Sequence, residues 1–405
     1  MTKEKVIPQI RFSGFTDTWE QRKFREQYQK ITEKNDLSFG ADKIISVANM
    51  YFKSDVKQSD DDYMRSYNIM RLGDIAFEGN KSKHFAHGRF VENTIGDGIV
   101  SHVFDVFRPI ADYDLLFWKY LINYEGVMGR IMTRCTKAST MMTNLVADDF
   151  LAESILVPSI QEQQKIGAFL DKLDSLITLH QRKYDKLTKV KKAMLEKMFP
   201  ENGSPYPEIR FKGFTDAWKQ RKLSAIADKV TEKNVGLQYI ETFTNSAEFG
   251  IISQRDFFDH DIAKMSSLGG YYIVRSEDFV YNPRISTSAP VGPINRNKLG
   301  RIGVMSPLYT VFRPHDIDTT YLEYFFKSKY WHSFMNFNGD SGARSDRFSI
   351  KDSVFFEMPI PIPHIDEQKK IGEYLAYLDR LITLHQRKLE KLKNIKKACL
   401  EKMFV

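Results

Sequence analysis

Cysteine is scarce in this sequence, with only Cys135 and Cys399 among 405 residues. Two cysteines cannot build the disulfide framework of a small secreted protein. Long apolar runs are missing too: no stretch approaches the roughly 18 residues that a membrane-spanning helix needs. The opening residues MTKEKVIPQIRF lack the apolar core of a signal peptide. We therefore expect a cytoplasmic protein in a reducing compartment, with no membrane partner.

Catalytic motifs are also missing. There is no phosphate-binding loop of the GxxxxGK[ST] type. The Asn-Pro-Pro-aromatic motif of amino-methyltransferases has only a broken counterpart at Asn282-Pro283-Arg284, and no Pro is followed by Asp as in the usual restriction-nuclease signature. His84 and His87 suggest a metal pair, but no Cys/His cluster accompanies them. We expect no catalytic residue, no cofactor site and no metal site in this chain.

The charge balance gives a weak indication of a partner. The chain has 60 Lys and Arg against 52 Asp and Glu, which gives a net charge of +8 and favours a polyanionic partner. Apolar residues make up 42% of the chain, which excludes a largely disordered protein. The length allows two or three domains.

The most informative stretch is residues 161–199, which contain no Pro and one Gly. Apolar residues recur there at alternating steps of three and four, which predicts a helix of about 58 Å that packs along another helix. A second copy occupies residues 366–404, and the block ITLHQRK is identical at 177–183 and 382–388. The predicted coiled-coil seam comprises Ile166, Leu170, Leu173, Ile177, His180 and Leu187, repeated as Ile371, Leu375, Leu378, Ile382, His385 and Leu392.

The rest of the chain is duplicated as well. PQIRFSGFTDTWEQRK at 8–23 returns as PEIRFKGFTDAWKQRK at 207–222. Gly14 and Gly213 are expected in turns, and Trp19 and Trp218 are expected to anchor these opening repeats. Between each opening repeat and each helix lies a body with β-branched and aromatic runs and short helical segments, which indicates an irregular α/β domain. Such a duplication, with similar helices and divergent bodies, indicates a scaffold that presents two different recognition surfaces.

These motifs together resemble the specificity subunit of a type I restriction-modification system. The resemblance rests on the paired RFxGFTDxW openings, the GD(I/F)-type strand, the helix starts at residues 158–166 and 363–371, and the twin basic helices. It covers essentially the whole chain. It implies two target-recognition domains that each read half of a bipartite DNA site, held by an antiparallel coiled coil that sets the half-site spacing.

The resemblance also implies partners. Double-stranded DNA, two methyltransferase (modification) subunits and motor-endonuclease (restriction) subunits are expected. The complex would carry adenine-N6 methyltransferase and ATP-dependent endonuclease activities. S-adenosylmethionine, ATP and Mg are then expected in the partner subunits, and none of them in this chain.

The expected fold class is α+β, with two α/β target-recognition domains joined by two long helices in a pseudo-two-fold internal duplication. The first target-recognition domain is assigned to residues 1–155 and the first conserved helix to 156–200. The second domain is assigned to 201–360 and the second helix to 361–405. Two rigid heads on a rod of fixed length would read two short sequences at a fixed distance along one duplex.

DNA contacts are expected from polar and basic side chains on loops of the two bodies. The alternative for each loop is a solvated basic surface. The candidates in the first body are Lys81, Lys83, His84, His87 and Arg89, with Arg134, Lys137, Ser139 and Thr140 on a second loop. The candidates in the second body are Arg284, Ser286, Thr287 and Ser288, with Arg344, Ser345 and Arg347 on a second loop.

His180 and His385 sit at the midpoints of the two predicted helices. If the repeats pack antiparallel, the two histidines meet near the centre of the coiled coil, where a polar residue favours one register. Two imidazolium ions in contact would repel, so at least one ring should be neutral, with a lowered pKa. A pair of solvent-facing histidines is the alternative.

Two other function classes remain open at this point. One is a non-catalytic coiled-coil adaptor with weak non-specific DNA binding, and the other is an enzyme with an unrecognised site. Salt-dependent binding to duplex DNA, strengthened by a methyltransferase partner, would select the specificity module. Binding of S-adenosylmethionine by the isolated chain would favour an enzyme.

Overall fold

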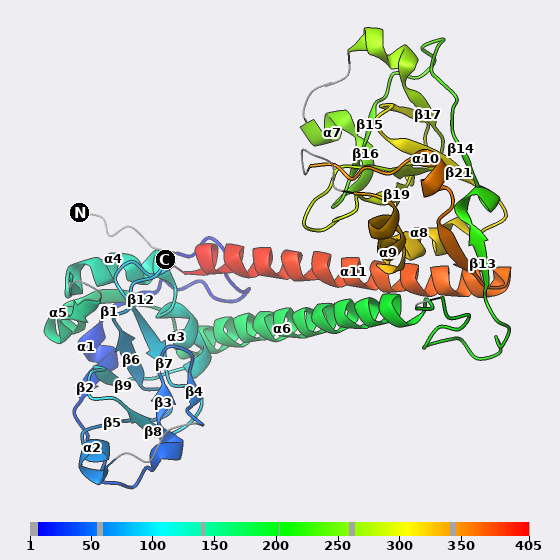
Figure 1. Ribbon diagram of the computed structural model, residues 1–405. Coiled ribbons are helices and arrows are strands. Elements are labelled where there is room, and N and C mark those ends of the chain that lie inside the picture. The colour runs from blue at the N-terminus through cyan, green and yellow to red at the C-terminus, as the bar shows by residue number, and fades with distance from the viewer. Residues whose placement is uncertain are drawn as a thin grey trace. The chain divides into compact units, whose positions relative to one another are not determined.

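The computed structural model describes residues 7–54, 60–138, 142–201, 203–258, 264–340 and 346–404. The chain divides into two compact units: unit 1 is Met1–Gln181 with Gln386–Val405, and unit 2 is Arg182–His385. Helices α6 (Ile160–Lys197) and α11 (Ile365–Met403) each contribute one end to unit 1 and the other end to unit 2 (Figure 1). Each helix begins and ends within two residues of the apolar-periodic stretches at 161–199 and 366–404.

Unit 1 is built around the antiparallel four-stranded sheet β2-β9-β6-β7. Its strands are β1 (Glu20–Lys23), β2 (Tyr28–Ile31), β3 (Ile45–Ser46), β4 (Tyr51–Phe52), β5 (Asn68–Met70), β6 (Ile75–Glu78), β7 (Arg89–Glu92), β8 (Gly98–Val100), β9 (Val106–Pro109), β10 (Thr136–Ala138), β11 (Thr143–Leu145) and β12 (Ser154–Val157). Its short helices are α1 (Phe24–Gln27), η1 (Ala41–Lys43), α2 (Asp61–Arg65), α3 (Leu115–Leu121), α4 (Glu125–Cys135) and α5 (Ala147–Ala152). Phe90 and Phe107 on this sheet pack with Phe150 of α5, and all three are buried.

Unit 2 repeats this topology in its four-stranded sheet β14-β21-β18-β19. Its strands are β13 (Lys219–Lys222), β14 (Ala227–Lys229), β15 (Phe243–Ser246), β16 (Gly250–Ser253), β17 (Tyr272–Val274), β18 (Phe279–Tyr281), β19 (Ile294–Arg296), β20 (Gly303–Met305), β21 (Thr310–Pro314) and β22 (Pro359–Ile362). Its short helices are η2 (Leu223–Ala225), α7 (Gln254–Phe258), η3 (Met265–Gly270), α8 (Thr319–Lys327), α9 (Tyr330–Asn338) and α10 (Asp352–Phe355). The pairing of β1 with β12 recurs as β13 with β22, which confirms the internal duplication.

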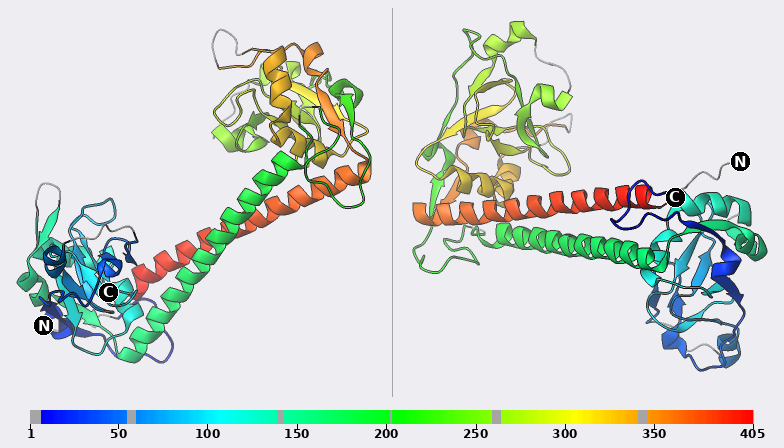
Figure 2. Two further views of the ribbon diagram at one scale, coloured as in Figure 1. Left: turned by 60° about the horizontal axis from the view of Figure 1, so that its bottom comes forward. Right: turned by 180° about the vertical axis from the view of Figure 1, so that it is seen from behind.

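The two long helices run antiparallel within each unit. In unit 1 the start of α6 and the end of α11 meet the same aromatic helix: a Cβ on Gly167 would lie 2.6 Å from Phe117 N, and the Phe404 and Phe117 rings lie 5.8 Å apart. In unit 2 the end of α6 and the start of α11 share a core, with Phe199 and Leu375 both buried in it. Figure 2 shows the end of α11 beside unit 1 in both views. The α+β fold with an antiparallel coiled coil is therefore as predicted.

The opening repeats bind the first turn of each long helix. Arg11 Nε and Nη2 donate to the two oxygens of Glu162 at 2.7 and 2.8 Å, and Trp19 Nε1 donates to the same carboxylate at 3.2 Å. In unit 2, Arg210 holds Glu367 at the same two distances. The helix-start motif thus supplies a buried carboxylate, and the opening motif supplies its cation.

The turns and anchors of the opening repeats are confirmed. Gly14 and Gly213 have φ values of 95° and 99°, a region that favours glycine in turns. Trp19 and Trp218 are 5% and 4% exposed. Both tryptophans therefore anchor their opening repeat in the core of its own unit.

In each body an arginine on one strand of the four-stranded sheet forms an ion pair with a buried aspartate that precedes another strand. Arg108 of β9 donates to Asp74, just before β6, at 3.0 Å. In unit 2, Arg313 donates to Asp278 at 2.7 and 2.9 Å. Both aspartates are 1% exposed. These ion pairs therefore help to hold the four-stranded sheet of each unit together.

Candidate nucleic-acid interface

In unit 1 the two predicted loops lie against each other. One connects β6 to β7, and the other connects β10 to β11. Thr143 N–H donates to the Gly79 carbonyl and Thr143 Oγ1 to the His87 carbonyl, both at 2.8 Å. Asn80 and Met142 form a β-bridge between the loops. Stretches more than 50 residues apart in the sequence thus form one surface.

The basic side chains on this surface differ in how they are held. Lys81, Lys83 and His84 are exposed. Arg89 instead donates to Glu78 at 2.8 Å and to the Ala48 carbonyl at 2.6 Å, and it stacks over a phenylalanine ring. The first three candidates are therefore available to a ligand, whereas the Arg89 guanidinium is engaged within the chain.

The second loop of unit 1 shows the same contrast. Lys137 is exposed on β10. Arg134, at the end of α4, is ion-paired with Glu153, and its Nε lies 2.7 Å from Glu153 Oε1. Ser139 and Thr140 lie outside the described residues.

Unit 2 brings its two predicted loops together at the matching place. Arg284 and Arg347 form a β-bridge. Ile285 N–H donates to the Asp346 carbonyl at 3.1 Å, and Phe348 N–H to the Pro283 carbonyl at 2.7 Å. Phe348 is buried in the core of unit 2 and so fixes the second loop.

The unit 2 candidates are mostly exposed. Arg284, Thr287 and Arg347 have exposed side chains. Ser286 and Ser288 are exposed and lie 3.2 Å apart through their hydroxyl oxygens. Arg344 and Ser345 lie outside the described residues. The β-bridge thus brings the backbones of two exposed arginines, one from each loop, next to each other.

Glycine is required at the base of both hairpins. Gly88 and Gly292 have φ values of 78° and 84°. A Cβ at these positions would lie 2.6 Å from the Glu78 carbonyl oxygen and 2.1 Å from the Asn282 carbonyl oxygen. Since no side chain fits at such distances, these glycines fix how each loop returns to its sheet.

An asparagine network that we did not predict supports the unit 2 loop. Asn245 is 1% exposed and donates to the Val280 carbonyl at 2.7 Å. Asn295 donates to Asn245 Oδ1 at 2.7 Å, and Asn282 donates to the Asn245 carbonyl at 2.8 Å. This network joins β15, β18 and β19 at the start of the loop. Several asparagines near predicted strand ends were the only sequence signal.

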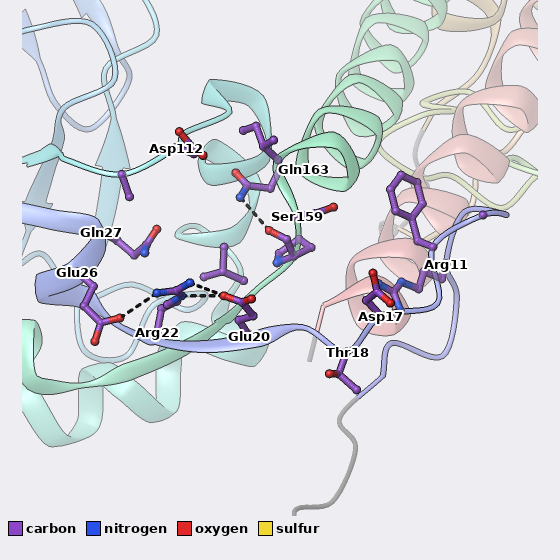
Figure 3. Close-up of a pocket in the computed structure, with 16 residues that line it drawn as sticks. Arg11, Asp17, Thr18, Glu20, Arg22, Glu26, Gln27, Asp112, Ser159 and Gln163 are labelled. Carbon is purple, nitrogen blue, oxygen red and sulfur yellow. Dashed lines mark hydrogen bonds and ion pairs between the residues drawn. The ribbon is translucent and has the colours of Figure 1, made fainter.

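A cleft of about 400 Å³ lies in unit 1 where the opening repeat meets β1 and the start of α6 (Figure 3). Arg22 lies between Glu20 and Glu26, with Nη1 3.8 Å from the Glu26 carboxylate. Arg11 is bound to Glu162. Both arginines of the cleft are thus paired with carboxylates of the chain, which makes the cleft a poor cradle for phosphate.

Within the described part of the chain, no group of three or more His, Cys, Asp and Glu side chains is arranged to hold a metal ion. Over the same residues, no helix combines the length and the apolar character that crossing a membrane requires.

The predicted seam residues lie on the packed sides of α6 and α11. Buried positions in the core of their own unit are Ile166, Leu170, Leu173, Ile371, Leu375 and Leu378. Half-buried positions are Ile177, His180, Leu187, Ile382, His385 and Leu392. The meeting of His180 with His385 stays a prediction.

The family model for the type I restriction modification DNA specificity domain matches this chain twice, at residues 29–189 and 218–394. Two matches at corresponding places agree with the duplicated topology of units 1 and 2. The chain therefore belongs to the type I restriction-modification DNA specificity family, as a specificity subunit with two target-recognition domains.

Individual relatives are distant. The chain is 24% identical over 257 residues to the type I restriction enzyme MjaVIII specificity subunit of Methanocaldococcus jannaschii, covering 60% of this chain and 59% of that protein. It is 21% identical to the putative MjaX specificity subunit of the same organism, over 98% of this chain and 95% of that protein. The S subunit of a type I restriction-modification system from M. genitalium has the same fold, with a TM-score of 0.56, 13% identity and 99% coverage of both chains.

Proposed function

We propose that this protein gives a type I restriction-modification complex its DNA sequence specificity, and that each target-recognition domain reads one half of a bipartite, asymmetric site. The observation that supports this most strongly is the pairing of two polar loops at the same place in both units. The two copies keep one scaffold but differ in the side chains on those loops, as two unlike half-sites require.

The exposed cations on these loops suggest how DNA is bound. Arg284 and Arg347 can each donate two parallel hydrogen bonds to a guanine edge or to a phosphate. Lys81 and Lys83 are flexible point charges suited to phosphate contacts, which position the duplex without reading it. Arg89 is held by Glu78 and mostly covered, so it shapes the first surface, whereas Arg134 is paired with Glu153 but has an exposed side chain.

We propose the following roles for the rest of the chain and for its partners. The coiled coil sets the half-site spacing and docks two methyltransferase subunits, and motor-endonuclease subunits complete the assembly in the cytoplasm. Adenine-N6 methylation with S-adenosylmethionine, and ATP- and Mg-dependent cleavage, reside in those partners. Residues 1–155 and 201–360 form the recognition domains, and residues 156–200 and 361–405 form the conserved helices.

The competing function is a coiled-coil adaptor with weak, non-specific DNA binding. The observation that favours it is the row of exposed lysines on the long helices, which includes Lys183, Lys186 and Lys189 on α6. Such a surface binds any duplex through its phosphates. The two functions therefore differ in whether one sequence is preferred over unrelated DNA.

Competition binding separates them. The complex with its methyltransferase subunits is titrated with an unmethylated duplex that contains the sequence it methylates, and with a scrambled duplex, at several salt concentrations. We expect the wild-type complex to bind the site at least about 10³-fold more tightly than the scrambled duplex. In the double variant Arg284→Ala/Arg347→Ala this ratio should fall by roughly 10-fold or more, since one base contact contributes about 1–3 kcal/mol. Lys212→Ala/Lys219→Ala is the matched control, because it removes two exposed cations from the opening repeat of the same unit. Equal affinity for both duplexes would support the adaptor.

A further inference from the structure

Each unit contains a cluster in which a helix of the recognition domain meets both long helices. In unit 1, Asp174 of α6 accepts the Tyr120 hydroxyl of α3 at 2.7 Å and the Lys396 ammonium of α11 at 2.6 and 2.8 Å. One carboxylate therefore joins three helices. The cluster is partly exposed, with Asp174 at 35% and Lys396 at 24%.

Unit 2 repeats the cluster. Asp379 of α11 accepts the Tyr324 hydroxyl of α8 at 2.7 Å and is bound by Lys191 of α6. The same shift of 205 residues relates Asp174 to Asp379 and Lys191 to Lys396. The long helices thus exchange roles between the units, and the cluster is a feature of the duplicated scaffold.

The tyrosines are permanent donors in these clusters. Burial, and then the hydrogen bond to Asp174, raise the pKa of Tyr120 far above its usual value. Burial and Asp379 do the same to the pKa of Tyr324. The Lys396 ammonium also lies 5.0 Å from the centre of the Tyr120 ring, so this lysine contacts both Asp174 and Tyr120.

The opposite end of α3 is attached to α6 independently. Gln163 accepts the Asp114 N–H at 3.3 Å, and Gly167 allows the backbone at Phe117 to approach α6 closely. Gln163 and Asp174 are 11 residues apart on one helix, which corresponds to about 16 Å. Two attachments at this separation fix the direction of α3 along α6. The buried apolar core that α3 shares with α6 and α11 holds the helices together, and the two polar attachments add direction to that packing.

We propose that the Tyr120–Asp174–Lys396 and Tyr324–Asp379–Lys191 clusters are positioning sites that fix the angle of each recognition domain on the helix pair. They thereby make the complex strict about half-site spacing. The inference rests on the proposed function and adds to it the residues that hold the spacing. One extra base pair moves a half-site by about 3.4 Å and turns it by roughly 35°. A head held at two points resists both displacements.

The test uses the whole chain in complex with its methyltransferase subunits. Plasmids carry the two native half-sites with the native gap, or with one base pair more or less, and the initial rate of N6-methyladenine formation is measured on each. The variants are Tyr120→Phe, which removes only the hydroxyl, and Asp174→Asn, which removes the charge that binds Lys396. Lys397→Met is the matched control, since this neighbouring lysine is 77% exposed.

We expect the ratio of rates between the native gap and the altered gaps to fall at least about threefold in both variants, with the half-site bases unchanged and the control as wild type. A lower thermal midpoint with an unchanged ratio would show that the cluster only stabilises the fold, and would overturn the inference. A change in the preferred bases would overturn it as well. A wild-type complex that methylates no two-part site would refute the proposed function itself.

Discussion

Replacing Glu162 with Gln tests how the opening repeat is attached to the first long helix. Glu162 has a side chain only 1% exposed, and it carries both hydrogen bonds from Arg11, whose side chain is 12% exposed. Glutamine has only one acceptor oxygen. Its NH₂ group would take the place of the second carboxylate oxygen and would face an Arg11 N–H, so two donors would meet with no acceptor between them. Removing one partner of a buried ion pair typically costs about 3–5 kcal/mol. We expect the free energy of unfolding of unit 1 to fall by about 3 kcal/mol in Glu162→Gln.

The assay must separate the two units, because a chain with two compact units need not unfold in one step. Hydrogen exchange followed by mass spectrometry reports the opening free energy of each unit through its own peptides. Glu162→Gln should accelerate exchange in unit 1, and Glu367→Gln should do so in unit 2, where Arg210 is held in the same way. Glu26→Gln is the control: its ion pair with Arg22 is 3.8 Å long and about half exposed, so it should change stability by less than about 1 kcal/mol. Equal effects of Glu162→Gln and Glu26→Gln would refute the reasoning.

Three further predictions concern stability and spacing. Burial raises the pKa of Glu92 to about 10, so the folded chain keeps a proton that the unfolded chain releases. The free energy of unfolding of unit 1 should therefore fall by about 1.4 kcal/mol per pH unit between about pH 4.5 and pH 10, and Glu92→Gln should remove that slope when urea unfolding at pH 5 and pH 8 is followed through peptides of unit 1. Gly167→Ala should destabilise unit 1 by about 1–2 kcal/mol in hydrogen exchange, whereas Gly372→Ala should destabilise unit 2 by less, because the added Cβ would lie 3.1 Å from its nearest neighbours rather than 2.6 Å. Four residues inserted after Lys189 should lengthen the recognised gap by about two base pairs in methylation mapping, since they add about 6 Å of helix; an active variant with the original gap would contradict this.

The sequence predicted the duplicated architecture because repeated motifs occur at a nearly constant shift. The two long helices, the glycine turns of the opening repeats and the mixed strands and short helices of the bodies all appear as expected. The loops were predicted as corresponding pairs, and the structure brings each pair together through backbone hydrogen bonds. Local patterns and repeats were sufficient for these features.

The partners of individual side chains were not predictable. Arg11 and Glu162 are 151 residues apart, and nothing in either motif says that one binds the other. Equivalent positions in the two bodies also carry different charges: Glu92 lies opposite Ile75 in unit 1, and Arg296 lies opposite Phe279 in unit 2. Because the sequences of the two bodies differ so much, the equivalence of Glu92 and Arg296 becomes visible only from the strand register. Contacts of this kind depend on tertiary packing, which local patterns do not encode.

On the proposed function, the two recognition domains are separate readers on one scaffold. The most direct test of this replaces residues 30–150 with the corresponding segment of another specificity subunit and maps N6-methyladenine across a genome that expresses the chimaera with its methyltransferase subunits. We expect a two-part site in which one half is new, while the other half and the gap equal those of the wild-type chain. A site in which both halves change together would contradict it.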